Sequence, residues 1–352
     1  MSSSIPVSVD PPAPDPGPSS LSASRWPFSL YNRFSAWRKA LDLPNPGTSE
    51  NLTKEAKNTL LNNYLFDGAR ADLSKSLSMN PAFNVTHSFT LGSQTAPPAY
   101  HFGAIFANEN LFLHGNIDND GSMSGRINQG WTANNVTKAQ AQLSSQAGQN
   151  FFQVEHDYQG SDYTLNAKAV NPSPADGTGI YIGSYLQSFT KNLALGVEAV
   201  LQRPSPDMAD VAAAYMVKYT STDRNWIATA QVQGAGILQA TYWQKLSDKV
   251  DVAADLQLVA GQGRRDALAS LAARYELRMA SFRAQVDSTG KVAAHLEQRF
   301  APTFSFLVSG EIDHFKNAAK VGVGVMIESA SFTPEEMALM PPPPGSAGLS
   351  AP

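Results

Sequence analysis

The 352-residue sequence contains no cysteine and carries little charge. Without cysteine there are no disulfide bonds, zinc ribbons or thiol nucleophiles. Charged residues make up 16% of the chain, against roughly 25% in an average soluble domain. The net charge is −4 and the pI is near 5.9. A nucleic-acid-binding domain is typically basic, so no nucleic-acid partner is expected.

Long hydrophobic runs are missing as well. No apolar run approaches the ~18 residues that a membrane-spanning helix needs, and the longest candidates, such as 321–327, are much shorter. The first twenty residues have neither a basic n-region nor an apolar h-region, which argues against a secretory signal. By these indicators alone the chain looks like a soluble protein, so the pattern of its strands has to decide.

Signatures of catalysis and metal binding are also absent. The six histidines are scattered, with no pair at the spacing that places two metal ligands on one helix face. There is no G-x-S-x-G motif and no P-loop. The sequence therefore predicts neither an enzyme nor a bound cofactor.

Composition and residue spacing divide the chain into four parts. Residues 1–24 are rich in proline and serine and are predicted to be disordered. Residues 25–66 are expected to be helical, and 70–328 to form strands. The last part, 329–352, is expected to begin a helix near Thr333 and to end in a disordered proline-rich tail.

Two helices are predicted before the strand region. Apolar residues at three- and four-residue spacing in 25–43 predict an amphipathic helix, which Pro44 would end. Thr48 or Ser49 would cap a second helix over 49–63. The apolar positions that share one face of this second helix are Leu52, Ala56, Leu60 and Leu61.

Alternating segments of about ten residues fill the region 70–328. In 250–260, for example, Val250, Val252 and Leu256 alternate with Asp251 and Asp255. About nineteen such segments follow one another, separated by turn signals. Strands of ~9–11 residues cross a bilayer, whereas soluble strands average ~5–6. The sequence therefore predicts an all-β fold, a transmembrane β-barrel of about nineteen strands with short helices at its ends.

A soluble all-β protein would show the same alternation, because it packs its apolar face inward. Sandwiches and propellers are the alternatives of this kind, and with them a soluble binding protein. The length and number of the strands, and the absence of a regular repeat period, favour the membrane barrel.

Strand alternation also predicts which side chains face a water-filled lumen. Charged side chains should line the lumen, and apolar side chains should face lipid. Basic residues share the lumen face with acidic ones, and a local excess of acid is expected around Asp251, Asp255, Glu311 and Asp313. The acids predicted to face the lumen are Asp118, Glu155, Asp157, Glu198, Asp251, Asp255, Glu276, Glu297, Glu311 and Asp313.

The last strand carries a short motif. It contains a polar residue, then glycine, then two hydrophobic residues, and it resembles the β-signal by which barrels of the mitochondrial outer membrane are recognised for insertion. A strand that first pairs with an assembly machine benefits from such a regular edge. The residues of this predicted assembly signal are Lys320, Gly322, Val325 and Ile327.

Further stretches resemble a known family. They are 68–75, 78–83 and 87–89, which form the first predicted hairpin, and then 113–116 and 125–128. These residues resemble the channel-forming β-barrel subunit of the outer-membrane preprotein translocase, the TOM complex, in its fungal form, within the eukaryotic porin superfamily. The resemblance implies a nineteen-stranded barrel in the mitochondrial outer membrane, with a helix inside it, that conducts unfolded precursors.

The resemblance also implies partners. The acidic lumen positions would guide precursors with basic presequences without holding them tightly. Small single-helix subunits, receptor subunits, membrane lipid and further copies of the barrel would surround it. A metabolite porin of the VDAC type is the alternative with the same architecture. Such a porin needs only a short helix before its first strand, whereas this chain has about 70 residues there.

Overall fold

The computed structural model divides the chain into two units, Met1–Leu43 and Pro44–Pro352. In the first unit the structure describes a turn, in which the Leu41 N–H donates a hydrogen bond to the Arg38 carbonyl. The predicted head, most of the first predicted helix and the C-terminal helix near Thr333 lie outside the described residues. The structure describes residues 38, 41–93, 97–145, 148, 150–234, 236–261 and 264–330.

The second unit contains one sheet of nineteen strands. All nineteen have eight to thirteen residues, close to the length of about ten that the sequence predicts. In chain order the strands are β1 (Gly68–Met79), β2 (Ala82–Thr90), β3 (Ala99–Ala107), β4 (Leu111–Asp118), β5 (Met123–Thr132), β6 (Asn135–Leu143), β7 (Phe151–Gln159), β8 (Tyr163–Val170), β9 (Gly179–Ser188), β10 (Leu193–Ser205), β11 (Met208–Thr220), β12 (Trp226–Gln233), β13 (Ile237–Ser247), β14 (Val250–Gly261), β15 (Arg264–Glu276), β16 (Ala280–Asp287), β17 (Lys291–Ala301), β18 (Phe304–Asp313) and β19 (Ala318–Ala330).

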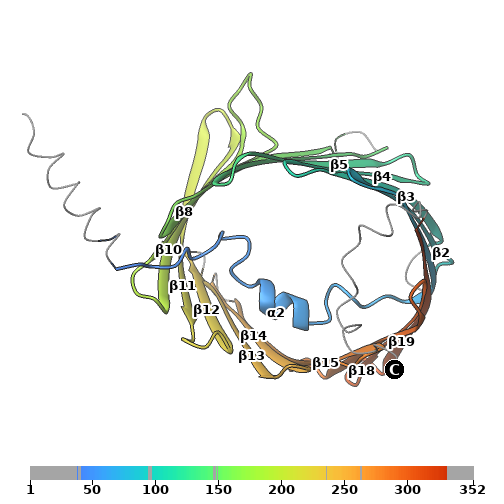
Figure 1. Cartoon of the computed structure of the whole chain (residues 1–352). Helices are drawn as coiled ribbons and strands as arrows, with labels where there is room; N and C mark the ends of the chain where they lie inside the picture. The colour runs from blue at the N-terminus through green and yellow to red at the C-terminus, as the bar shows by residue number, and fades with distance from the viewer. Residues whose placement is uncertain are drawn as a thin grey trace, which may run out of the picture. The chain divides into compact units, whose positions relative to one another are not determined.

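The sheet closes on itself, as Figure 1 shows. Each strand pairs with the next in antiparallel fashion, and β1 also pairs with β19 in parallel fashion, with Gly68 opposite Gly322. Because nineteen is odd, the last strand runs in the same direction as the first. Closure pairs every strand on both sides, which removes the exposed edges of an open sheet. The predicted nineteen-stranded barrel is confirmed, and a soluble sandwich or propeller is excluded.

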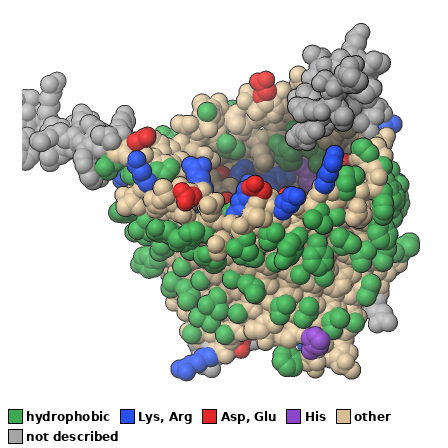
Figure 2. All heavy atoms as spheres, turned by 60° about the horizontal axis from the view of Figure 1, so that its bottom comes forward, with side chains coloured by type: hydrophobic (Ala, Val, Ile, Leu, Met, Phe, Trp, Pro, Cys, Tyr) green, Lys and Arg blue, Asp and Glu red, His purple; other side chains and the backbone are tan. Residues whose placement is uncertain are grey.

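The outer wall of the barrel is apolar. On β14 and β15, Leu256, Leu271 and Tyr275 point outward and are exposed. Figure 2 shows a broad band of hydrophobic side chains on the side of the wall in view, with most of the visible charged side chains along the upper rim and a few at the lower edge. An apolar band bounded by charge suits the hydrocarbon core of a bilayer. The described helices are too short or too polar to span a membrane.

A short helix, α2 (Lys54–Thr59), lies inside the ring of strands, close to β13, β14 and β15 (Figure 1). The predicted helix over 49–63 was too long. Thr53 precedes the helix without a side-chain capping bond, and Leu60 is extended, with φ −64° and ψ 150°. Thr48 does not cap either, because its hydroxyl accepts a hydrogen bond from the Asn51 amide at 2.9 Å.

The apolar face predicted for this segment is confirmed. All four of its residues, Leu52, Ala56, Leu60 and Leu61, are buried. Leu52 packs in one cluster with Leu186 of β9 and Met216 of β11, whose side chains point into the lumen. The inner segment 44–67 is therefore fixed to the inner wall by apolar contacts as well as by hydrogen bonds.

Candidate functional site

The ten predicted acids all share the inner face of the barrel. Residues opposite each other in adjacent strands point to the same side, so the register carries the face from strand to strand. Asp255 of β14, for example, lies between Thr241 of β13 and Ser270 of β15. The registers place on this face Asp118, Glu155, Asp157, Glu198, Asp251, Asp255, Glu276, Glu297, Glu311 and Asp313. Their role in passing a substrate stays a prediction.

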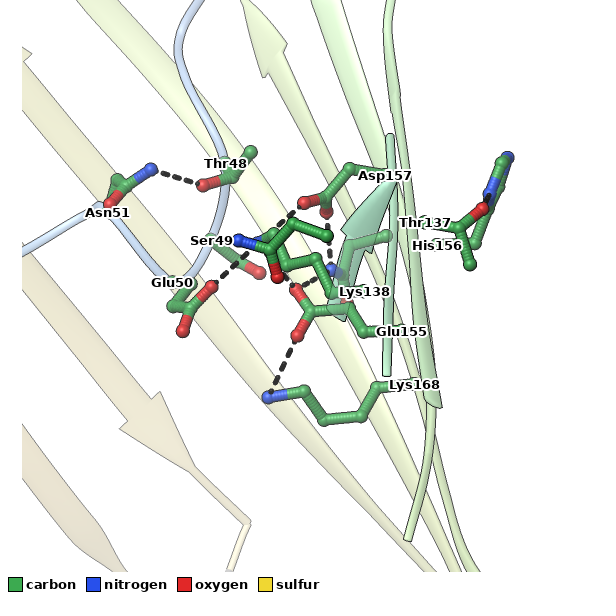
Figure 3. Close-up of polar contacts among 12 residues, drawn as sticks. Thr48, Ser49, Glu50, Asn51, Thr137, Lys138, Glu155, His156, Asp157 and Lys168 are labelled. Atoms are coloured by element: carbon green, nitrogen blue, oxygen red, sulfur yellow. Dashed lines mark hydrogen bonds and ion pairs between the residues drawn. The ribbon is translucent and has the colours of Figure 1, made fainter. Parts of the chain in front are cut away.

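Two of these acids belong to a charged cluster around Lys138 of β6 (Figure 3). The Lys138 ammonium lies 2.8 Å from Glu50 Oε2, 2.8 Å from Asp157 Oδ2 and 3.3 Å from Glu155 Oε1. Lys168 lies 3.6 Å from Glu155. Glu155 and Asp157 are each only 2% exposed. This Lys138 cluster is satisfied internally, so its two buried acids offer little to a passing cation.

Glu50 connects the Lys138 cluster to the inner segment. The hydrogen bond from Lys138 lowers the pKa of Glu50, so the carboxylate stays charged at neutral pH. Ser49, next to it, accepts a hydrogen bond from the Ser184 hydroxyl of β9 at 2.9 Å. Asn45 donates to the Gly160 carbonyl at 2.7 Å. The start of the inner segment is thus anchored to the wall between β6 and β9.

Most of the remaining acids lie within ion-pair distance of a basic side chain. Arg274 lies 2.8 Å from Glu276 and 3.3 Å from Asp251. The other pairs are His101 with Asp118, Lys291 with Glu311, and Arg299 with Glu297. These groups are only partly buried, and ion pairs of this kind are weak and exchange readily.

The predicted patch of four acids does not form. Asp251 and Asp255 lie on β14, whereas Glu311 and Asp313 lie on β18, so three strands separate the two pairs. The Asp313 carboxylate also accepts the backbone N–H groups of Phe315 and Lys316 at 3.1 and 2.9 Å. Asp313 therefore stabilises the turn after β18. The prediction failed because strand alternation shows which face a side chain occupies, but does not show which side chains are neighbours around the barrel.

Glu198, Asp255 and Asp313 differ from the other seven predicted acids, because no basic side chain of the described residues lies within ion-pair distance of them. Asp255 is buried and accepts a hydrogen bond from Gln257 at 3.0 Å. Glu198 of β10 is only partly buried. Glu198 thus combines partial exposure with the lack of an ion pair to a described residue.

Five further acids of the described strands share the lumen face, although they were not predicted. Asp72 pairs with Arg70 at 2.7 Å and accepts a hydrogen bond from Ser88 at 2.6 Å. The same strand alternation would have identified all of them. These acids are Asp72, Asp210, Asp266, Asp287 and Glu328.

The predicted assembly-signal residues occupy both faces of β19. Lys320 and Gly322 face the lumen, opposite Glu311 and Ser309 of β18, whereas Val325 and Ile327 face outward. This agrees with the expected lipid face of the strand. The recognition of this strand during assembly stays a prediction.

A groove of about 860 Å³ runs along the outer wall from β11 to β16. Many of the side chains that line it are alanines. Tyr219, Tyr242 and Leu271 border it. The alanines of the floor are Ala228, Ala230, Ala240, Ala254 and Ala269. Rows of small residues allow a helix backbone to approach closely within a membrane.

Comparison with known proteins is consistent with this architecture. The sequence profile of the family described as eukaryotic porin matches residues 45–322. Mitochondrial import receptor subunit TOM40 of Saccharomyces cerevisiae is 42% identical over 333 residues, covering 89% of this chain and 85% of the yeast protein. The Neurospora crassa protein of the same name is 38% identical over 318 residues, covering 87% and 89%. The human TOM40 homolog is 32% identical over 296 residues, covering 81% and 79%.

Proposed function

This chain belongs to the eukaryotic porin family, together with the mitochondrial import receptor subunits TOM40, and from that premise we propose that it forms the protein-conducting channel for precursor import across the mitochondrial outer membrane. The observation that carries the proposal is the closed barrel with an apolar outer wall and a charged inner wall. The wall is suited to lipid, and the lumen is suited to a hydrated polypeptide.

The lumen offers acids that a basic presequence can reach. Glu198 makes no ion pair with a described basic side chain, although Lys168 is near enough to interact with it electrostatically. Glu276 and Glu50 have 52% and 45% of their side chains exposed, although each is near a basic group. Glu297 is partly exposed and pairs with Arg299 at 3.3 Å. Acids whose ion pairs are weak and exchange readily support the transit of a precursor without arresting it. We assign the precursor path to them rather than to Glu155 and Asp157.

Replacing three accessible acids is expected to weaken the block of the channel by a presequence peptide. In a planar bilayer, the triple variant Glu198→Gln, Glu276→Gln and Glu297→Gln should need about tenfold more peptide for half-block, because partly exposed ion pairs contribute up to about 1 kcal/mol each. The matched control removes three exposed turn acids, with Asp120→Asn, Asp223→Asn and Asp248→Asn. It makes the same change in net charge and should leave the block unchanged.

The outcome also separates the two kinds of pore. An import channel is blocked by the peptide in a voltage-dependent way, and the variant that lacks the three lumen acids binds the peptide more weakly. A metabolite porin of the VDAC type would show no block that depends on the presequence. An equal effect of both triple variants would mean that net charge, rather than the named lumen acids, attracts the peptide.

The outer groove supports the proposal of a single-helix partner. A transmembrane helix would lie on the alanine floor, where Ala240 and Ala254 permit close approach. Receptor subunits and further copies of the barrel would bind to other parts of the apolar wall. We propose lipid as the neighbour of the remaining outward side chains.

A further inference from the structure

The stretch between α2 and β1 is fastened to the last strands of the barrel. The Leu61 N–H donates to Gln285 Oε1 of β16 at 2.7 Å, and the Phe66 N–H donates to Ser309 Oγ of β18 at 3.3 Å. The Arg283 guanidinium lies 4.0 Å from the centre of the Tyr64 ring. This second anchor is separate from the first one, which holds Asn45 and Glu50 near β6 to β9.

The Phe66 ring packs against β19 at a point where that strand has glycine residues, which leave room for the ring. A Cβ added to Gly322 would lie 2.7 Å from Cδ2 of the Phe66 ring and would also meet the Phe66 carbonyl oxygen. A Cβ on Gly324 would lie 3.2 Å from Phe66 Cζ and 3.2 Å from Leu307 Cβ. A side chain at position 322 and the observed position of Phe66 are thus mutually exclusive.

This place is at the seam where the barrel closes. Gly322 is the Cα partner of Gly68, the first residue of β1, and Phe66 lies two residues before Gly68. Parallel pairing is slightly less stable per residue than antiparallel pairing. The seam also joins strands at the two ends of the barrel sequence, so no short turn holds them together. It is therefore the pairing with the least local support.

We propose that the Tyr64–Phe66 segment is a lock on the β1–β19 seam. Phe66 lies two residues before β1 in the chain, but its ring packs against Gly322 of β19. Separating the two strands therefore requires the ring to leave its place on Gly322. Tyr64, under Arg283 and 5.9 Å from the His295 ring, holds the segment in place. The glycine at position 322 thus serves the finished barrel, in addition to any part in its assembly.

Hydrogen–deuterium exchange on the full-length protein in lipid vesicles tests the lock. In Phe66→Ala, amides of β1 and β19 should exchange about tenfold faster, while β8 and β9 keep their wild-type rates. The matched control is Asn45→Ala, which weakens the first anchor and should leave the seam unchanged. No acceleration in Phe66→Ala, equal acceleration throughout the barrel, or the same seam effect in Asn45→Ala would each overturn the proposal.

A second pair of variants tests the packing of Phe66 on Gly322 without altering Phe66. Gly322→Ala places a methyl group where the Phe66 ring packs, and should also speed exchange at β1 and β19. Gly310→Ala, on the neighbouring strand, meets nothing within 4 Å and should have no effect. This pair keeps the proposal falsifiable if Phe66→Ala fails to insert. Equal exchange in the two glycine variants would contradict it.

Discussion

Replacing Lys138 with methionine is expected to destabilise the barrel by about 3 kcal/mol, because the loss of one partner leaves buried charges uncompensated. Glu155 and Asp157 would remain buried beside each other, hydrogen-bonded to the Asn166 amide, and among the described residues Lys168, 3.6 Å from Glu155, would be the one cation left in ion-pair range. The free energy of unfolding of the protein in detergent micelles, followed by tryptophan fluorescence during denaturant titration, measures the effect. Glu50→Gln in the Lys138→Met background should restore part of the loss, since it removes one of the acids.

The control for this prediction is Lys245→Met. Lys245 also makes a 2.8 Å ion pair, but its partner Asp248 lies on an exposed turn. Water solvates both groups there, so the free energy of unfolding should not change measurably. If Lys138→Met were as stable as the wild type, the Lys138 cluster would be solvated by lumen water, and the inner segment would not depend on it.

A charge on the outer face of the last strand should have the second large effect. Val325 faces outward on β19, opposite Phe306 of β18. Arginine on a lipid face costs about 2–4 kcal/mol near the bilayer midplane. We therefore expect Val325→Arg to abolish most insertion into vesicles, measured as the fraction of barrel protected from protease.

The neighbouring residue supplies the control. Met326 faces the lumen and has Asp72 of β1 as its Cα partner. Met326→Arg introduces the same charge one position away, on the hydrated side, so it should insert nearly normally. Equal loss in both variants would show that any charge in this strand prevents assembly, whichever face it occupies.

The fold was accessible from the sequence because the signal is local and repeated. Alternation along each strand fixes which side chains share a face, and this placed Glu198 and Asp255 on the lumen side without knowledge of neighbouring strands. Register between strands is a different matter. That Lys138 reaches Asp157, and that Asp251 and Glu311 lie far apart around the barrel, depends on pairing, which alternation does not encode.

The inner segment was only partly predictable, for a related reason. Its apolar face was visible in the spacing of Leu52 and Ala56, but its length was not. The extended residue Leu60 ends the helix so that the Leu61 N–H can reach Gln285 of the nearby strand β16. The seat of Phe66 on Gly322 joins residues 256 positions apart in a sequence that shows no local sign of the contact. Tertiary contacts of this kind override local helix preference.

The most direct test of the channel is to trap a precursor inside it. A photo-reactive residue at Val200 would face the lumen beside Glu198, whereas one at Leu201, the next residue, would face outward. A precursor arrested during import should crosslink to position 200 and not to position 201, while a probe at Ala240 should capture a membrane-embedded helix instead. Crosslinking of the precursor from position 201, or from neither position of β10, would contradict passage through the lumen.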